Sequence, residues 1–209
     1  MREATRSLED PLSREGAGPV RWWILAAGVL ALLIAAPAHT ARAYSYSAQG
    51  AEPLIDAREE VRDALNASDL SRAQEASQKV QEELTYLDEE FSLSLRSALE
   101  SAFQAGDAQA VDRVFRAAFV AEIRRRLSAA GGLLSDYQSA KTLVVKAKRF
   151  FDLLAPDLDT ERRDRGNTGL VTCLEAIGNP GVFGVGARDP DPEAFERGRA
   201  EVFASLETP

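Results

Sequence analysis

Residues 54 to 155 contain no proline and repeat their apolar side chains at helical spacing, and this stretch constrains the fold more than any other feature. The glycines within it are Gly106, Gly131 and Gly132. Apolar residues that return every three or four positions line one face of an amphipathic helix, and several such faces together bury a core. We therefore predict an all-α protein, a bundle of about four amphipathic helices followed by two shorter C-terminal helices.

Capping residues and breakers set the predicted boundaries of the four helices. Ser68 is the expected N-cap of the second helix, and Ser135 with Gln138 matches the capping box that would open the fourth. The four predicted helices span residues 53–66, 68–102, 107–130 and 135–155. The stripe expected to be buried on the uninterrupted second helix is Ala73, Ala76, Val80, Leu84, Leu87, Phe91, Leu95, Ala98 and Ala102.

A short internal repeat marks two of these boundaries. Residues 64–69, ALNASD, match residues 102–107, AFQAGD, at an offset of 38 positions. In each copy a helix would end in small residues and the aspartate would start the next helix, which suits a tight helix-to-helix turn. Two copies fall short of the three that a solenoid needs, so we expect a pair of helical hairpins within one bundle.

The C-terminal part has a different pattern. We expect a charged link at residues 157–167, a short helix at 168–177 and a last helix with Asp191 as N-cap and Pro192 at its first position. The glycine-rich residues 178–186 lack the features of a phosphate-binding loop, so we interpret them as a structural turn that needs positive φ. Phe183 and Val185 are expected to fill the core.

Residues upstream of the bundle form a candidate export signal. Trp22 to Ala38 is an apolar run, and small residues occupy Ala41 and Ala43, the two positions that a signal peptidase reads. We therefore predict cleavage between Ala43 and Tyr44 and a periplasmic or secreted mature protein. The run, residues 22–38, is at the lower limit of length for spanning a bilayer, so a retained signal anchor is the alternative.

The predicted organisation has three parts. Residues 1–43 are a signal or anchor helix with a polar N-terminal extension, residues 44–52 a flexible linker, and residues 53–209 a single all-α domain. A domain of this length can bury a core large enough to fold without disulfides.

The composition excludes several kinds of site. The chain carries 33 Asp and Glu against 25 Lys and Arg, a formal net charge of −8, so it has no long-range attraction for nucleic acid or anionic lipid. The only histidine, His39, precedes the predicted cleavage site, so the mature chain lacks the usual general base and the usual zinc, copper or haem ligand. Cys173, the only cysteine, is expected to be a buried core residue.

Runs of carboxylates are the remaining candidates for a metal site. In a helical bundle, glutamates that project inward from facing helices can bind iron and other hard cations. The carboxylates here lie beside the apolar stripes rather than within them, so we interpret them as a solvated surface that binds hard cations only weakly. The candidates are Glu59, Glu60, Glu89 and Glu90, with Glu82, Glu83 and Asp88 beside them.

Two further charged segments have structural interpretations. Residues 157–161 alternate carboxylates, but Arg162 and Thr168 stand where a calcium loop needs glycine and glutamate. Arg124, Arg125 and Arg126 are expected near the end of the third helix, where their charge suits the negative end of the helix dipole. The same arginines could instead hold an anionic group.

The repeated turns and the acidic helix before them resemble the periplasmic helical domains that accompany bacterial high-affinity iron permeases. The matching residues are 64–69, 102–107 and the acidic segment 58–62, REEVR. The permease signature Arg-Glu-x-x-Glu is absent, because Arg62 stands where its second glutamate would be. The resemblance covers less than half of the mature chain and implies a role beside iron uptake.

These patterns predict an exported, non-enzymatic helical protein that binds a protein partner in the cell envelope or serves as an accessory subunit of an envelope complex. The alternative is a carboxylate-based metal-ion-binding accessory protein, which would fit periplasmic iron uptake. An enzyme that works with carboxylates alone is the third hypothesis. We expect no cofactor and no nucleic-acid partner, and contact with a membrane only through an uncleaved N-terminal segment.

Overall fold

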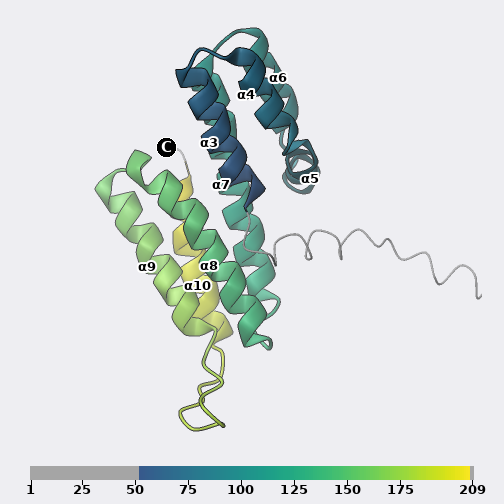
Figure 1. The fold of residues 1–209 in the computed structure, drawn as a ribbon. Coiled ribbons are helices and arrows are strands. Elements are labelled where there is room, and N and C mark those ends of the chain that lie inside the picture. The colour runs from purple at the N-terminus through teal and green to yellow at the C-terminus, as the bar shows by residue number, and fades with distance from the viewer. Residues whose placement is uncertain (1–51, 208–209) are drawn as a thin grey trace, which may run out of the picture. The chain divides into compact units, whose positions relative to one another are not determined.

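Helix α7, Ala108–Gly131, is the element along which the other helices are arranged (Figure 1). The structure is a computed structural model that describes residues 52–207, which belong to one unit, Glu52–Pro209. In this described part the chain forms eight α-helices, one short 3-10 helix and no strand. The predicted all-α fold is confirmed.

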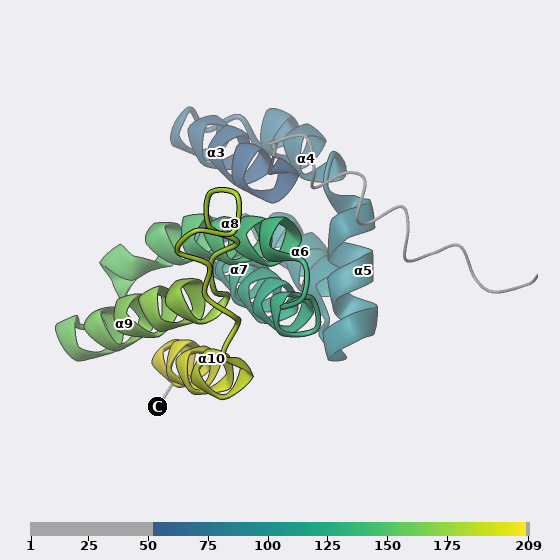
Figure 2. The ribbon, with the colours of Figure 1, turned by 90° about the horizontal axis from the view of Figure 1, so that it is seen from below.

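Helices from both sides of α7 in the sequence pack against it. Helix α3 packs on α4 and on α7, whereas α6 packs on α5 and on α7; α8 runs beside α7, and α9 and α10 form the most closely packed pair (Figure 2). The elements before α7 are α3 (Pro53–Asn66), α4 (Leu70–Gln78), α5 (Gln81–Phe91) and α6 (Leu95–Gln104). Those after it are α8 (Tyr137–Leu154), η1 (Ala155–Asp157), α9 (Thr160–Ala176) and α10 (Pro192–Leu206).

The two copies of the sequence repeat fold into the same turn. At the end of α3, Ser68 takes a φ of 59° and the Asp69 amide donates to the Ala64 carbonyl at 2.8 Å. At the end of α6, Gly106 takes a φ of 64° and the Asp107 amide donates to the Ala102 carbonyl at 3.0 Å. A left-handed residue followed by this six-to-one hydrogen bond is the Schellman arrangement that ends a helix. Each turn joins two packed helices, α3 to α4 and α6 to α7.

Two of the predicted caps are wrong. Ser68 is already left-handed, so the side chain that caps α4 is that of Asp69, which accepts from the Arg72 amide at 3.0 Å. At α8 the cap is Asp136, which accepts from the Ser139 amide at 3.1 Å, so Ser135 with Gln138 is wrong by one position. The predicted N-cap Asp191 is confirmed, and Asp107, which was predicted to open the third helix, is the N-cap of α7.

The predicted second helix is wrong, because residues 70–104 form three helices. Ser92 is left-handed with a φ of 53°, and the Asp88 carboxylate accepts from the Leu95 amide at 2.6 Å, so Asp88 belongs to α5 and caps α6. The break shifts the buried face: Ala98 is exposed and Leu99 is buried in its place. The rest of the predicted stripe is buried, apart from a half-buried Phe91.

The charged link predicted at residues 157–167 is also wrong, because α9 begins at Thr160. Gly166 and Gly169 of α9 allow neighbouring helices to pack closely against it. A Cβ at Gly169 would lie 2.6 Å from the carbonyl oxygen of Gly198 in α10, and a Cβ at Gly166 would lie 2.3 Å from the Phe151 ring. Only glycine at these positions lets the helices approach this closely, which offsets its poor helix propensity.

The glycine-rich segment between α9 and α10 is a projecting loop rather than a core plug. Gly178, Gly181, Gly184 and Gly186 all have positive φ, as predicted. Phe183 and Val185 are 103% and 79% exposed, which corrects the expectation that they fill the core.

No helix in the described part, residues 52–207, is both long enough and apolar enough to cross a membrane. The candidate signal, Trp22 to Ala38, and the candidate cleavage site, Ala43 and Tyr44, lie outside the described residues.

Candidate functional site

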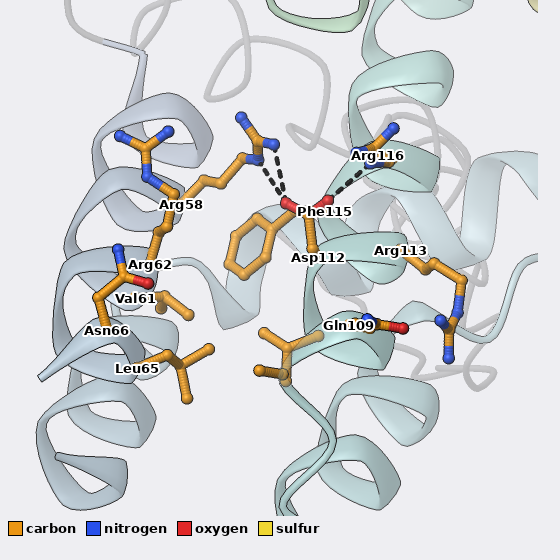
Figure 3. A pocket seen from close by; sticks show the side chains of 12 residues that line it. Arg58, Val61, Arg62, Leu65, Asn66, Gln109, Asp112, Arg113, Phe115 and Arg116 are labelled. Carbon is orange, nitrogen blue, oxygen red and sulfur yellow. Dashed lines mark hydrogen bonds and ion pairs between the residues drawn. The ribbon is translucent and has the colours of Figure 1, made fainter. Parts of the chain in front are cut away.

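A groove between α3 and the first turns of α7 combines an apolar floor with an excess of positive charge (Figure 3). Its volume is about 660 Å³. The charged groups that line it are four arginines and one aspartate: Arg58, Arg62, Arg113, Arg116 and Asp112. In a chain whose net charge is −8, this is a local reversal of sign.

Asp112 organises the inner side of the groove. Arg58 reaches across from α3 and donates through Nε and Nη2 to Asp112 Oδ1 at 3.2 and 2.8 Å, as Figure 3 shows. Arg116 donates through Nε to Asp112 Oδ2 at 2.6 Å and also pairs with Asp157. Partial burial would raise the pKa of Asp112, but the two guanidinium groups outweigh it and hold that pKa below its ordinary value. Asp112 is therefore a fixed carboxylate that holds two arginines in place.

The two outer arginines, Arg62 and Arg113, are only weakly paired with carboxylates. Arg113 is 63% exposed in its side chain and contacts Asp107 at 3.4 Å. Arg62 is exposed and has no ion pair or hydrogen bond within residues 52–207. Guanidinium groups with free donors bind carboxylate and phosphate groups in a bidentate manner. The apolar side chains that form the floor of the groove are Val61, Leu65, Val111 and Phe115, of which Leu65 is half-buried and the other three are buried.

A second group of charges on α7 lies in the interior. Arg126 donates to both oxygens of Glu52, at 3.2 and 2.6 Å, and to Glu122 at 2.7 Å. Glu52 is 2% exposed, Arg126 3% and Glu122 4%. Arg125 closes the group from one side with two bonds to Glu122. We call these residues, with Lys146 of α8, the buried charge cluster.

The buried charge cluster joins the start of α3 to α7 and α8. Burial would raise the pKa of Glu122, but the charges of Arg126 and Arg125 outweigh it and hold that pKa below its ordinary value. Lys146 Nζ lies 3.3 Å from Glu52 Oε1, yet it makes no hydrogen bond of good geometry. The cluster is closed to solvent, so it is a structural element rather than a binding surface.

The arginines predicted to complement the dipole of the third helix do not do so. Helix α7 continues to Gly131, and its last turn contains no basic residue. Arg125 and Arg126 belong to the buried charge cluster, and Arg124 lies over the Phe203 ring, 4.9 Å from its centre, with Glu207 at 3.7 Å. The prediction depended on three adjacent arginines in the sequence. That pattern does not indicate that one of them, Arg126, is buried.

The carboxylates considered as metal ligands are spread over α3 and α5. Glu59, Glu89 and Glu90 are exposed, and Glu60 pairs with Lys79 at 2.5 Å. Over residues 52–207 no three or more Asp, Glu, His or Cys side chains come together as a metal-binding group. Asp88, beside Glu89, is engaged in capping α6.

Cys173 lies in the core between α9 and α10. It is 0% exposed, and its thiol donates to the Phe195 carbonyl at 3.6 Å. Burial raises the pKa of this thiol to about 12, so the reactive thiolate is scarce near neutral pH. Its predicted neighbours Leu170 and Ile177 are buried as well.

A second groove, beside α4 and α6, lacks the excess of positive charge found in the groove between α3 and α7. It measures about 850 Å³ and is lined mainly by glutamine and serine side chains. Its charged residues are Asp88, Arg96 and Glu100. The arginine-lined groove between α3 and α7 is therefore the stronger candidate for a binding site.

No family model matches this chain, and no curated protein or solved structure is significantly similar to it. Its function must therefore be argued from the site.

Proposed function

We propose that this is an exported, non-enzymatic protein that binds an acidic, amphipathic segment of a protein partner in the cell envelope. The observation that carries the proposal is the groove between α3 and α7, which is lined by four arginines, one aspartate and several apolar side chains. A helix or strand with apolar side chains on one face and carboxylates beside them would match both features.

The state of the charged groups supports a binding role. Arg58 and Arg116 are already fixed by Asp112, so the inner wall of the groove needs little rearrangement when a partner binds. Arg62 and Arg113 lie further out with free donors, where they can attract a carboxylate before contact. The groove thus combines a rigid wall with an accessible rim.

The same groups argue against acid-base catalysis in the groove. A general base works best when its pKa lies near the operating pH. The pKa of Asp112 is shifted the other way by its arginines, and the remaining ionisable lining residues are arginines, which stay protonated. Binding is the function that this set of residues supports best.

Peptide binding tests the groove. The purified protein is titrated with a labelled amphipathic peptide that carries leucines and glutamates, and with a second peptide in which lysines replace the glutamates. We expect binding of the acidic peptide only, weakened by salt. The double variant Arg62→Gln, Arg113→Gln should weaken it about tenfold or more, since bonds to charged groups contribute about 1.5–3 kcal/mol each.

A matched control keeps the number of removed charges constant. Arg72 and Arg197 are exposed arginines outside the groove, and the variant Arg72→Gln, Arg197→Gln should bind the acidic peptide as tightly as the unchanged protein. Equal affinity for both peptides would show that the arginines do not select the acidic one. An equal loss in both double variants would show that the net charge of the protein, rather than the groove, governs binding. Either result would contradict the proposal.

Export is tested separately by the intact mass of the protein recovered from outside the cytoplasm. A chain that starts at Tyr44 is the expected product, because Ala41 and Ala43 form the small-x-small pair. Retention of Trp22 to Ala38 would instead show that the segment anchors the protein, and absence from every fraction beyond the cytoplasm would contradict export.

A further inference from the structure

The loop between α9 and α10 is held in a defined shape by its backbone. Asn179 and Arg188 exchange two hydrogen bonds, at 2.8 and 2.7 Å, at its base. Nearer the tip, Val182 and Val185 exchange two more, at 3.1 and 3.0 Å. The projection of this loop beyond α9 and α10 is visible in Figure 1.

Three large apolar side chains stand at the tip of this loop. Val182 is 72% exposed, Phe183 103% and Val185 79%, whereas the other exposed large hydrophobic side chains of the described part reach 53% at most. Phe183 has a φ of 52°, a conformation unfavourable for a phenylalanine and held here by the paired valines on either side. Apolar side chains held out in this way mark an interaction surface.

The residues around the base of the loop are acidic. Within residues 175–193 the only cation is Arg188, and its guanidinium donates to the Glu175 carbonyl at 2.6 Å. The carboxylates of this stretch are Glu175, Asp189, Asp191 and Glu193, of which Glu193 lies 4.0 Å from Arg197. Negative charge here opposes contact with an anionic membrane and favours a partner that combines an apolar surface with positive charge.

The groove between α3 and α7 has that combination. Its floor is apolar and its rim carries the exposed Arg62 and Arg113. We propose that the loop tip of one copy, centred on Phe183, docks into this groove on a second copy, so that the protein associates head to tail. The inference rests on the proposed function, because it uses the same groove and names its occupant.

One copy cannot fill its own groove. The groove is lined by the start of α7, up to Arg116, whereas the loop leads into α10 at the other end of α7, where Phe195 lies 3.3 Å from the Cβ position of Gly131. At about 1.5 Å per residue, the stretch of α7 from Arg116 to Gly131 spans on the order of 20 Å. Each copy therefore offers one tip and one groove, which builds rings or open chains of copies.

Mixing two variants tests the contact. Phe183→Asp removes the apolar tip, and the double variant Arg62→Glu, Arg113→Glu reverses the rim. Sedimentation velocity of the unchanged protein should show an average mass that rises with concentration, because a contact this small is weak. Each variant alone should stay a single chain, while their mixture should form two-chain complexes and nothing larger, because one intact tip and one intact groove remain.

Each result supports or overturns the inference. Phe183→Asp should still bind the acidic peptide, and this peptide should dissociate the unchanged protein. If the unchanged protein stays a single chain while the peptide binds, the head-to-tail contact is wrong and the proposed function stands; if no peptide binds, the proposed function fails.

Two further outcomes would show that the loop tip or the protein makes a different contact from the proposed one. Variants that do not associate when mixed, although the unchanged protein does, would show a symmetric contact in place of tip and groove. Binding of the unchanged protein to neutral phosphatidylcholine vesicles, lost in Phe183→Asp, would show that the tip inserts into lipid. Val171→Asp, a change at a half-exposed valine of α9, is the control and should associate like the unchanged protein.

Discussion

The buried charge cluster and the arginine-lined groove both combine arginines of α7 with carboxylates and with residues at or before α3, yet they differ in almost every physical property. In the cluster, Arg126 is 3% exposed and all of its carboxylate partners lie within the core. In the groove, Arg62 is exposed and has no partner in the described part of the chain. Burial thus separates arginines that hold the helices together from arginines that are available to a ligand.

The difference follows from the cost of removing charge from water. A buried ion pair is weak evidence for net stabilisation, but breaking it by removal of one partner leaves an uncompensated charge in the interior. An exposed arginine keeps its hydration, so its removal costs little. Removal of an arginine should therefore destabilise the protein strongly in the buried charge cluster and hardly at all at the rim of the groove.

Arg126→Ala should have the largest effect, a loss of about 3–5 kcal/mol in the free energy of unfolding, because Glu52 is left buried without its bidentate partner. The loss also includes the contact of the guanidinium with the Phe150 ring, 4.8 Å from its centre. Chemical denaturation measures it, with Arg197→Ala as the exposed control. A change below about 1 kcal/mol would mean that the cluster contributes no more than a surface pair.

Glu122→Gln should destabilise the protein at neutral pH by about 1–3 kcal/mol, since Arg125 and Arg126 lose a charged acceptor. The pKa of Glu122 is lowered in the folded protein, so the stabilisation is fully present above its ordinary value and is lost as the pH falls through the folded pKa. Melting curves from neutral to acid pH should therefore converge for the variant and the unchanged protein. A gap that stays constant down to low pH would show that ionisation of Glu122 is not the cause.

Lys146→Met should be neutral or stabilising by up to about 1 kcal/mol. The Lys146 ammonium is buried beside Glu52 without a hydrogen bond, and Arg126 already satisfies both oxygens of that carboxylate. An apolar side chain of similar length removes the cost of burying this charge. A loss as large as that expected for Arg126→Ala would show that Glu52 needs both cations as partners.

Much of the fold was predictable from local patterns, and the helix boundaries that were predicted wrongly have two causes. Helix α3 and the N-caps Asp107 and Asp191 follow from proline, small residues and aspartates whose effects are confined to a few neighbouring positions. The start of α9 at Thr160 has a local signal, because the Asp159 side chain caps the helix by accepting from the Arg162 amide at 2.9 Å. The break near Ser92 depends instead on Asp88 of α5, which caps α6. Such contacts between elements are not contained in the periodicity of the sequence.

The candidate site was less predictable for the same reason. Arg58 and Asp112 lie 54 positions apart in sequence, and Glu52 lies 74 positions from Arg126, so no local motif joins either pair. The one signal in the sequence was the segment 58–62, where Arg58 and Arg62 stand beside the carboxylates of Glu59 and Glu60. Phe183 was assigned to the core because it is apolar, but it is fully exposed. Apolar character alone does not distinguish a buried side chain from one at the tip of a projecting loop.

Arg62→Gln should have the smallest effect on stability, within about 0.5 kcal/mol of the unchanged protein, because the side chain is exposed and makes no ion pair within residues 52–207. Its removal could even help slightly, since Arg58, Arg113 and Arg116 line the same groove and repel it. That repulsion is screened by salt, so any gain should be largest at low ionic strength and vanish in concentrated salt. Chemical denaturation at two salt concentrations measures the difference. A clear destabilisation at both would place Arg62 with Arg126 as a structural residue, and the contrast between the two regions would then fail at the arginine on which the binding proposal depends.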